Sequence, residues 1–360
     1  MNFNHNYKNR IYGLDIFRTI AIMIVVHFHA SFMLKGSIFE GFPWIKIIDV
    51  VELFFVLSGF LIGSILIKIV EKKQFKLNFK DLHTFWKRRW IRTLPNYFLF
   101  LLVNYLFIHF RLINGDLSKF NYKFVLFIQN FKTSFEAFFW ESWSLSIEEW
   151  FYILFPLSLL LTLKIFPSKK GILISIITLI IIPLLFRISK SDVDLDPHTW
   201  SLNIRKVVVM RLDVIIYGVL AAYVKYYYSN FWIKYRFIAF LIGLTTMFSL
   251  LYLHKDYNSF FMKTFYLNLT AICVMLLLPL ASSIQQFKTF IGKAITHISI
   301  ISYSMYLVNF LLVQFISKNF KITNPSDGLF KYVIYWLLTI SISSFIYYCF
   351  EKPILNLRDK

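Results

Sequence analysis

The chain has 360 residues, of which 58% are hydrophobic and 20% are aromatic, and only 16% carry a charge. Soluble domains contain about 45–50% apolar and about 25% charged residues, so this composition excludes a soluble globular protein. The formal net charge of +20 does not require a nucleic-acid partner, because the basic loops of a membrane protein face anionic lipid headgroups.

Apolar runs of about 18–25 residues predict ten membrane-spanning helices, and therefore an all-α, polytopic transmembrane bundle. The ten runs lie near 12–34, 45–70, 94–113, 144–165, 171–189, 207–228, 237–254, 264–284, 298–317 and 329–350. A further aromatic stretch, 122–140, is interrupted by polar residues, so it predicts a re-entrant or interfacial segment rather than a span. We expect one membrane domain over residues 1–360.

The loop 71–93 between the second and third runs is rich in Lys and Arg, and the positive-inside rule places it in the cytoplasm. With ten spans both termini are then cytoplasmic, and the expected location is the cytoplasmic (inner) membrane. The N-terminal run is too long and too charged to be a cleavable signal peptide. Cys273 and Cys349 lie in apolar stretches, so we expect no disulfide framework and no metal site.

The first apolar run, Tyr12–Leu34, contains ionisable side chains that cost at least ~2.5–3.5 kcal/mol each in hydrocarbon, so they indicate a function. On a helix Arg18 and His29 share one face, with Cα atoms ~16 Å apart along the axis at ~1.5 Å per residue. Asp15 lies one turn before Arg18 and is expected to neutralise it. His27 falls on the opposite side of the helix.

In the second run, Asp49 and Glu52 are one turn apart near the outer end, where we expect them to pair with basic groups of other helices. Gly59 and Gly63 form a small-xxx-small pair that predicts the close approach of another helix. Ser58 is expected to bond back to a backbone carbonyl, and a role as nucleophile is not favoured.

A cluster of cations, FWKRRWIRTLPNYF (85–98), leads into the third run. Arg88 and Arg92 are one helical turn apart, and Arg89 lies close to one turn from Arg92. Planar guanidinium groups bind phosphates in a bidentate manner, so this cluster predicts a site for a phosphorylated cytoplasmic cofactor. The alternative is that the positive charge only anchors the topology.

The fourth run opens with ESWSLSIEEWFYILFPL (141–157), in which Ser146 and Glu149 fit a capping box. Glu148 and Tyr152 share a helix face. A carboxylate at the mouth of a membrane cavity can serve as a general acid or base, or as a hydrogen-bond anchor for sugar hydroxyls. The alternative for Glu148 is an interfacial, solvated side chain.

Arg211 and Asp213 lie two residues apart in the sixth run, where each needs a partner. Two residues on a helix point about 200° apart, so we expect partners on different neighbouring helices and an internal ion-pair network. In the ninth run Ser302, Tyr306 and Asn309 form one polar face, for which interhelical hydrogen bonding is favoured over catalysis. The segment 351–353 (EKP) predicts a helix end at the cytoplasmic surface.

Taken together, these stretches resemble acyltransferase family 3, the integral-membrane acyltransferases that modify bacterial surface glycans. Each shared motif is weak alone, but the ordered set runs along nearly the whole chain and is specific. The motifs are Arg18 with His29, FFVLSGFLI (54–62), RRWIR (88–92), WSLSIEEWFY (143–152), RLDVIIYG (211–218), SYSMYL (302–307) and EKP (351–353).

The resemblance implies a cytoplasmic acyl-coenzyme A donor, acetyl-CoA in particular, and an acceptor at the outer face. The functional positions that it implies are Arg18, His29, Arg88, Arg89, Arg92 and Glu148. Substrate binding is assigned to Glu52, Trp143, Tyr152, Arg211 and Asp213.

The chain departs from the family pattern at three positions. Glu52 stands where Asp is usual, and Thr19 where Gly commonly follows the arginine. Asn309 occupies a place often held by His, so no proton-transfer role is carried over to it. Some relatives append a soluble SGNH-type hydrolase domain; since this chain ends seven residues past Pro353, transfer is expected to be completed by the membrane domain or by a separate protein.

The expected reaction is O-acyl transfer, of an acetyl group, to a hydroxyl of an extracytoplasmic or lipid-linked glycan such as lipopolysaccharide, capsule or exopolysaccharide. The arginines of 88–92 would hold the coenzyme A phosphates, and Arg18 would line the thioester's path and polarise its carbonyl. His29 would act as general base or as transient acyl carrier, and Glu148 would orient the acceptor or accept its proton. The ~16 Å between Arg18 and His29 suggests two stations on one route across the bilayer.

Two other functions stay open. A transporter or flippase of a glycan intermediate also needs intramembrane charges and a midplane cavity, but it would need no coenzyme A. Donor binding that depends on Arg88 and Arg89 separates it from an enzyme. A catalytically inactive membrane scaffold is the other alternative; the presence of Arg18, His29 and Glu148 speaks against it, whereas Asn309 leaves it open.

Overall fold

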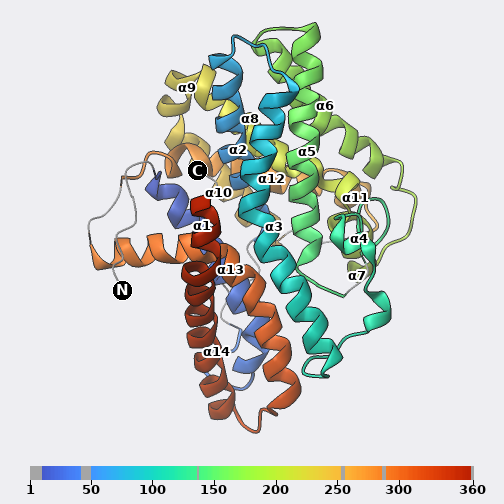
Figure 1. Cartoon of the computed structure of the whole chain (residues 1–360), viewed down its shortest axis with the longest axis vertical. Helices are drawn as coiled ribbons and strands as arrows, with labels where there is room; N and C mark the ends of the chain where they lie inside the picture. The colour runs from blue at the N-terminus through green and yellow to red at the C-terminus, as the bar shows by residue number, and fades with distance from the viewer. Residues whose placement is uncertain (1–9, 42–49, 136–137, 253–255, 286–288, 358–360) are drawn as a thin grey trace.

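The structure is a computed structural model that describes residues 10–41, 50–135, 138–252, 256–285 and 289–357. Within these ranges all regular structure is helical, which confirms the predicted fold class (Figure 1). The long helices are α1 (Tyr12–Ala30), α2 (Val51–Lys72), α3 (Phe79–His109), α5 (Ser142–Ile165), α6 (Lys169–Ile188), α8 (Val208–Tyr227), α10 (Arg236–Tyr252), α12 (Tyr266–Ala281), α13 (Phe290–Asn319) and α14 (Pro325–Ile346). Short helical segments are η2 (Ser31–Leu34), η4 (Leu117–Lys119), α4 (Tyr122–Val125), α7 (Pro197–Trp200), η5 (Ser201–Arg205), α9 (Ser229–Lys234), α11 (Phe260–Thr264), η6 (Tyr347–Glu351) and α15 (Lys352–Leu357).

Among the described residues, seven helices are long and apolar enough to cross a bilayer, which makes this a multi-pass membrane protein. They are Tyr12–Leu34, Val51–Lys72, Phe79–His109, Ser142–Ile165, Lys169–Ile188, Phe290–Asn319 and Pro325–Leu357. A pair bent by 70°, Pro197–Arg205 with Val208–Tyr227, would make an eighth. The remaining two predicted runs form the shorter apolar helices α10 and α12, so ten spans and two cytoplasmic termini stay predictions.

The aromatic stretch 122–140 is not a continuous helix, in agreement with its predicted exclusion from the spans. After the single turn of α4 the chain folds back against the starts of α5 and α8. Asn130 is fully buried there, and its side-chain amide donates to the carbonyls of Trp143 (3.0 Å) and Lys206 (2.6 Å). These bonds tie the loop to both helix starts.

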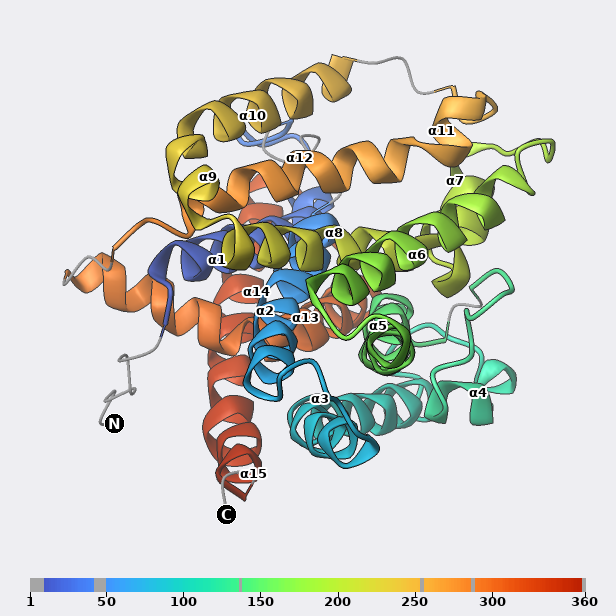
Figure 2. The ribbon, with the colours of Figure 1, turned by 90° about the horizontal axis from the view of Figure 1, so that it is seen from above.

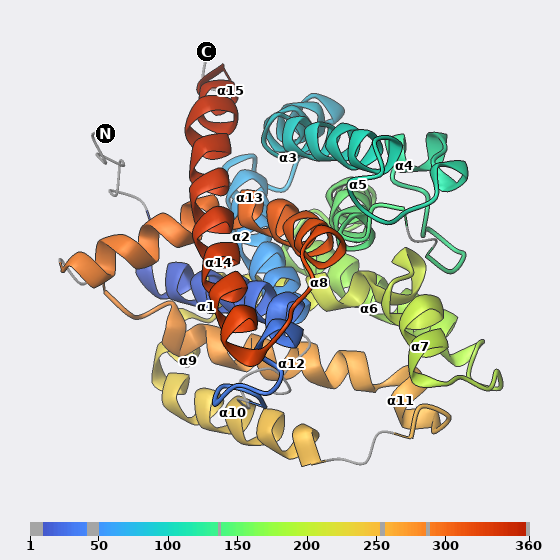
Figure 3. The same cartoon turned by 90° about the horizontal axis from the view of Figure 1, so that it is seen from below.

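The centre of the bundle is the contact between α2 and α8, with α3 on one side and α10 on the other (Figures 2 and 3). Glycines allow the two backbones to touch. A Cβ on Gly59 would lie 1.9 Å from the carbonyl oxygen of Ile215, and one on Gly218 would lie 2.0 Å from that of Val56. The predicted close approach at Gly59 and Gly63 is confirmed, because Gly63 lies against Val219 in the same way.

Two buried ion pairs hold α8 to its neighbours. Arg211 donates to Glu52 of α2, and Asp213 accepts from Arg187 of α6 and from Asn268 of α12 (2.8 Å). All four charged side chains are completely buried. The prediction that Arg211 and Asp213 meet partners on different helices is confirmed. Sequence reasoning did not identify Arg187, because its carboxylate partner lies 26 residues away on another helix.

The predicted helix end at 351–353 is wrong. The chain passes from α14 through the π-helical turn η6 into α15, and the widened turn precedes Pro353, whose ring would clash with the preceding turn of a regular helix. Glu351 is buried, and it accepts hydrogen bonds from Asn96 of α3 and Ser304 of α13, both at 3.0 Å. It therefore joins three helices instead of marking a surface.

Candidate functional site

The helix α1 carries the two side chains on which the predicted function depends. It is α-helical without a break over Tyr12–Ala30, so the spacing of eleven residues places Arg18 and His29 on one face. Their surroundings differ. The charged groups that act on Arg18 include Arg92 of α3 and Glu148 of α5, whereas His29 contacts α13. One helix face thus connects two chemically distinct regions.

Asp15 forms its ion pair with Arg10 and not with Arg18, although its negative charge also acts on Arg18 as predicted. Asp15 accepts from Arg10, including its Nε at 2.9 Å, and from the Ser299 hydroxyl at 2.7 Å. Arg10 precedes the helix and reaches the carboxylate with two of its three guanidinium nitrogens, Nε and Nη2. Arg18 is partly exposed and makes no hydrogen bond or ion pair within the described residues, which leaves its guanidinium available to a ligand.

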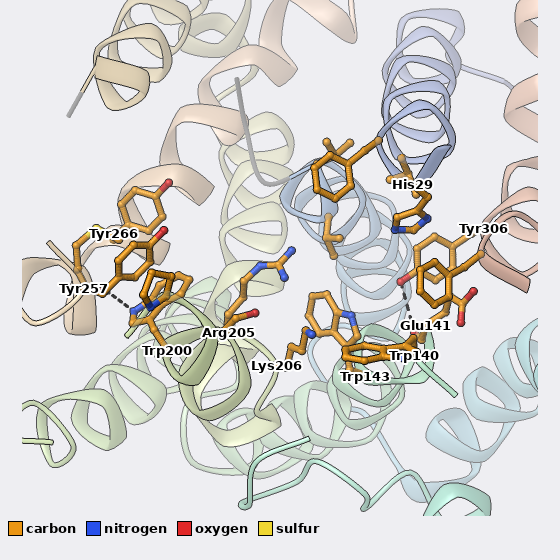
Figure 4. Close-up of a pocket in the computed structure, with 18 of the residues that line it drawn as sticks. His29, Trp140, Glu141, Trp143, Trp200, Arg205, Lys206, Tyr257, Tyr266 and Tyr306 are labelled. Atoms are coloured by element: carbon orange, nitrogen blue, oxygen red, sulfur yellow. Dashed lines mark hydrogen bonds between the residues drawn. The ribbon is translucent and has the colours of Figure 1, made fainter. Parts of the chain in front are cut away.

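His29 opens onto a cavity of about 860 Å³, which we call the aromatic cavity (Figure 4). Its walls come from α1, α13, the start of α5, the η5 turn and the chain near α11. The residues that line it are Val25, Phe28, His29, Val50, Val51, Trp140, Glu141, Trp143, Pro197, Trp200, Ser201, Arg205, Lys206, Leu251, Tyr257, Met262, Tyr266, Tyr306 and Phe310. Rings with a few polar groups among them are typical of small-molecule sites.

The hydrogen bonds of Asn309 determine which ring nitrogen of His29 carries the proton. The Asn309 amide nitrogen donates to the carbonyls of Met305 (2.8 Å) and Tyr306 (2.6 Å), so its side-chain oxygen must face the other way. That oxygen lies 2.5 Å from Nδ1 of His29 and can only accept. The proton of the neutral imidazole therefore sits on Nδ1, and Nε2 keeps a lone pair, as a general base requires.

Asn309 orients His29, and its replacement is expected to lower activity without removing the base itself. In Asn309→Leu the Nδ1 proton has no acceptor, so the tautomer and ring orientation are lost, and transfer is expected to fall by on the order of 10²–10⁴-fold. Asn309→Asp keeps an acceptor and should retain more activity than the Leu variant. Turnover of both purified variants, compared at equal folded protein, checks this order; equal loss in the two would contradict it.

A second polar group, the Glu148 cluster, consists of Ser58, Glu148 and Tyr152. The hydroxyls of Ser58 and Tyr152 both donate to Oε1 of Glu148, so the predicted shared face of Glu148 and Tyr152 is confirmed. Ser58 does not bond to a backbone carbonyl, because the carboxylate of α5 lies within its reach; that prediction is wrong. Ser58 and Glu148 are partly exposed, so the cluster is open to a bound molecule.

The predicted capping box of Ser146 and Glu149 is also wrong. The helix begins at Ser142, so both residues lie inside it. Ser146 donates to the carbonyl of Ser142 at 3.0 Å, and Glu149 accepts from Thr93 of α3 at 2.6 Å. Glu149 therefore joins two helices instead of closing a helix end.

The arginine cluster lies on α3, which runs unbroken from Phe79 to His109 into the bundle. Arg88 and Arg92 are exposed and form no ion pair with a described carboxylate, although Arg92 lies close enough to act on Arg18 and Glu351. Arg89 is partly buried, with its guanidinium carbon 5.8 Å from the centre of the Phe85 ring. Exposed guanidinium groups beside Arg18 are suited to phosphates, so the predicted donor site stays a consistent hypothesis.

Three of the five substrate-binding candidates are in contact, because Arg211 pairs with Glu52 and its guanidinium carbon lies 5.3 Å from the centre of the Trp143 ring. Trp143 lines the aromatic cavity, with the guanidinium carbon of Arg205 5.0 Å from its ring centre, whereas Tyr152 belongs to the Glu148 cluster. Glu52, Arg211 and Asp213 are paired inside the protein, and their contact with substrate stays a prediction. Asp49 lies outside the described residues.

Sequence reasoning missed Glu141, which lines the same cavity as His29. It is only 4% exposed, and burial raises the pKa of its carboxyl to about 8, so it is protonated at neutral pH. The available signal was a carboxylate beside Trp140 at the start of an apolar run. The role of acidic site residue was assigned instead to Glu148, which lies seven residues later within the motif WSLSIEEWFY.

The family model described as an acyltransferase domain matches residues 11–348. The "Peptidoglycan O-acetyltransferase OatA" of Listeria monocytogenes serovar 1/2a is 32% identical over 174 residues, which cover 45% of this chain and 26% of that protein. A Staphylococcus aureus (strain COL) protein named as a putative O-acetyltransferase is 26% identical over 384 residues, covering 96% of this chain and 58% of its own length. This chain thus spans only part of the curated relatives that it matches. No solved structure matches it.

Proposed function

The chain belongs to the acyltransferase family whose model it matches over residues 11–348, and we propose that it is a membrane O-acetyltransferase of glycans. The donor is acetyl-CoA from the cytoplasm, and the acceptor is a sugar hydroxyl at the outer face of the cytoplasmic membrane. The observation that carries this proposal is that Nε2 of His29 keeps a lone pair in a cavity lined with aromatic rings. Arg18 lies on the same helix face as His29, and the charge of Arg92 acts on it.

In this proposal the donor binds lengthwise along α1. Arg88, Arg89 and Arg92 bind the coenzyme A phosphates, and Arg18 lies beside the pantetheine arm. Because Arg18 and His29 are ~16 Å apart along the axis, the long arm bridges the two stations and brings the thioester to the cavity. Glu148 is held by two hydroxyls, its charge acts on Arg18, and it does not line the aromatic cavity, so we assign it to the donor side.

The chemical step is a direct acyl transfer. Nε2 of His29 takes the proton of the acceptor hydroxyl while the hydroxyl oxygen attacks the thioester carbonyl. The carbon–sulfur bond breaks, the ester forms, and the coenzyme A thiolate leaves and is reprotonated by the imidazolium. In the alternative route Nε2 first attacks the thioester, so that a carbon–nitrogen bond forms as the carbon–sulfur bond breaks and coenzyme A leaves; the acceptor hydroxyl then attacks the acyl-histidine, and the carbon–nitrogen bond breaks as the ester forms. Either route needs His29 neutral, with its proton on Nδ1.

The names of the relatives make peptidoglycan one candidate acceptor, and capsule, lipopolysaccharide and exopolysaccharide are others. The decisive experiment compares surface polysaccharides, by mass spectrometry, from cells with and without this gene. The expected result is one acetyl ester per modified sugar that mild alkali removes and that disappears with the gene. If loss of the gene lowers the amount of glycan at the surface while the glycan that still arrives there keeps its esters, the chain is a transporter instead.

A further inference from the structure

One oxygen of the Glu141 carboxyl group, Oε1, is buried without a hydrogen-bond partner among the described residues. The residue stands immediately before α5, but its side chain does not cap the helix. A buried polar atom that lacks a partner lowers stability, and native proteins rarely retain one without a reason. Because Glu141 lines the aromatic cavity, a ligand bound there can supply the missing hydrogen bond.

Hydrogen bonds from two side chains fix the position of the Glu141 backbone at the cavity wall. Its carbonyl accepts hydrogen bonds from the hydroxyls of Ser144 (3.2 Å) and Tyr306 (3.4 Å), and these two hydroxyls lie 2.7 Å apart. In Figure 4 the carboxyl lies beside the Tyr306 ring, on the side of the cavity where His29 also projects. The helix α13 thus positions both groups, through Tyr306 for Glu141 and through Asn309 for His29.

The surroundings of Glu141 match the chemistry of a sugar. Trp140 and Trp143 lie next to it in the cavity wall, and aromatic faces pack against the C–H faces of pyranose rings. A buried carboxyl that keeps its proton can both donate and accept, as a sugar hydroxyl does. A purely apolar acyl chain would leave Oε1 unpaired, so the ring-and-carboxyl combination favours a hydroxylated ligand over a lipid.

We propose that Glu141 binds a hydroxyl of the acceptor sugar and thereby determines which hydroxyl faces Nε2 of His29. Glu141 is then a specificity-determining residue of the outer cavity, distinct from Glu148 on the donor side. This inference rests on the acyl transfer proposed above.

The test uses the full-length protein in lipid nanodiscs, acetyl-CoA, and the cells' own polysaccharide stripped of esters by mild alkali. In Glu141→Leu the KM for the polysaccharide is expected to rise at least about tenfold, because one hydrogen bond to a buried group is lost, while the KM for acetyl-CoA stays unchanged. Glu141→Gln keeps a hydrogen-bond donor and an acceptor, so its KM for the polysaccharide should lie between that of the wild type and that of Glu141→Leu. The position of the new ester, read by NMR, is expected to become less selective in the Leu variant.

Glu71→Gln is the control, because Glu71 is a carboxylate outside the cavity, at the opposite end of α2 from Val51, where it accepts a hydrogen bond from Tyr227. It should leave both KM values unchanged. A Leu variant with the wild-type KM and the wild-type ester position overturns the inference, as does an equal rise in both KM values. Should the Leu variant not fold, the same readouts on Glu141→Gln decide. A wild-type protein that binds acetyl-CoA but never re-esterifies the polysaccharide overturns the proposed function, and the inference with it.

Discussion

Replacing His29 by Ala is expected to abolish acetyl transfer while the protein remains folded and inserted. The side chain is partly exposed to the cavity and makes one side-chain hydrogen bond, so its loss removes little packing. It removes the base with a free nitrogen in the cavity, and general-base catalysis contributes on the order of 10²–10⁴-fold. The measurement is the rate of ester formation by purified protein, together with its thermal unfolding temperature.

The chain offers a matched control for this variant two residues away. His27 lies on the opposite face of α1, where its Nδ1 is 2.6 Å from the hydroxyl of Tyr332. His27→Ala removes the same chemical group from the same helix and should keep the transfer rate within a few-fold of wild type. Full activity of His29→Ala, or equal loss in both variants, would refute the assigned role.

Breaking the buried pair of Arg187 and Asp213 is expected to have the largest effect on stability. In Asp213→Ala the guanidinium of Arg187 stays buried without its counter-charge, which costs about 3–5 kcal/mol in the free energy of unfolding. Removing both charges in Arg187→Met with Asp213→Leu should recover most of that loss, because no uncompensated charge remains. Unfolding in detergent, followed by tryptophan fluorescence, measures both variants.

The double variant also separates a structural role from substrate binding at Asp213. If the pair only joins α8 to α6, the recovered protein should transfer acetyl groups at a rate close to wild type. If Asp213 contacts the substrate, the protein will be stable but inactive. A double variant as unstable as Asp213→Ala would show that the two charges are not coupled.

Several parts of the site were predictable because they depend on spacing along one helix. The shared face of Arg18 and His29 follows from eleven residues of regular helix, and the shared face of Glu148 and Tyr152 follows from four. The glycine contact of α2 was predictable in the same way, since a pair of small residues one turn apart allows any neighbouring helix to approach closely. Such periodic patterns do not require knowledge of the partner.

Apart from the helix end at 351–353, the incorrect predictions concern the partners of polar side chains. Asp15 was assigned to Arg18, Ser58 to its own backbone and Glu149 to a helix cap, since only neighbours in sequence were considered. In the fold they meet Arg10, Glu148 and Thr93 respectively, and the last two partners come from other helices. A charged or hydroxyl group in a bundle binds the nearest complementary group in space, and helix packing decides which group that is.

The sequence by itself determined the membrane class, the helical fold and the face of α1 that carries the chemistry, because hydropathy and helical period are local properties. Only the tertiary structure decided that Asn309 orients His29, that Glu52 and Arg187 are the partners of Arg211 and Asp213, and that Glu141 shares a cavity with His29. Each of these facts joins residues that are far apart in the chain. Their contacts arise from side chains packing across several helices at once, which no single stretch of sequence specifies.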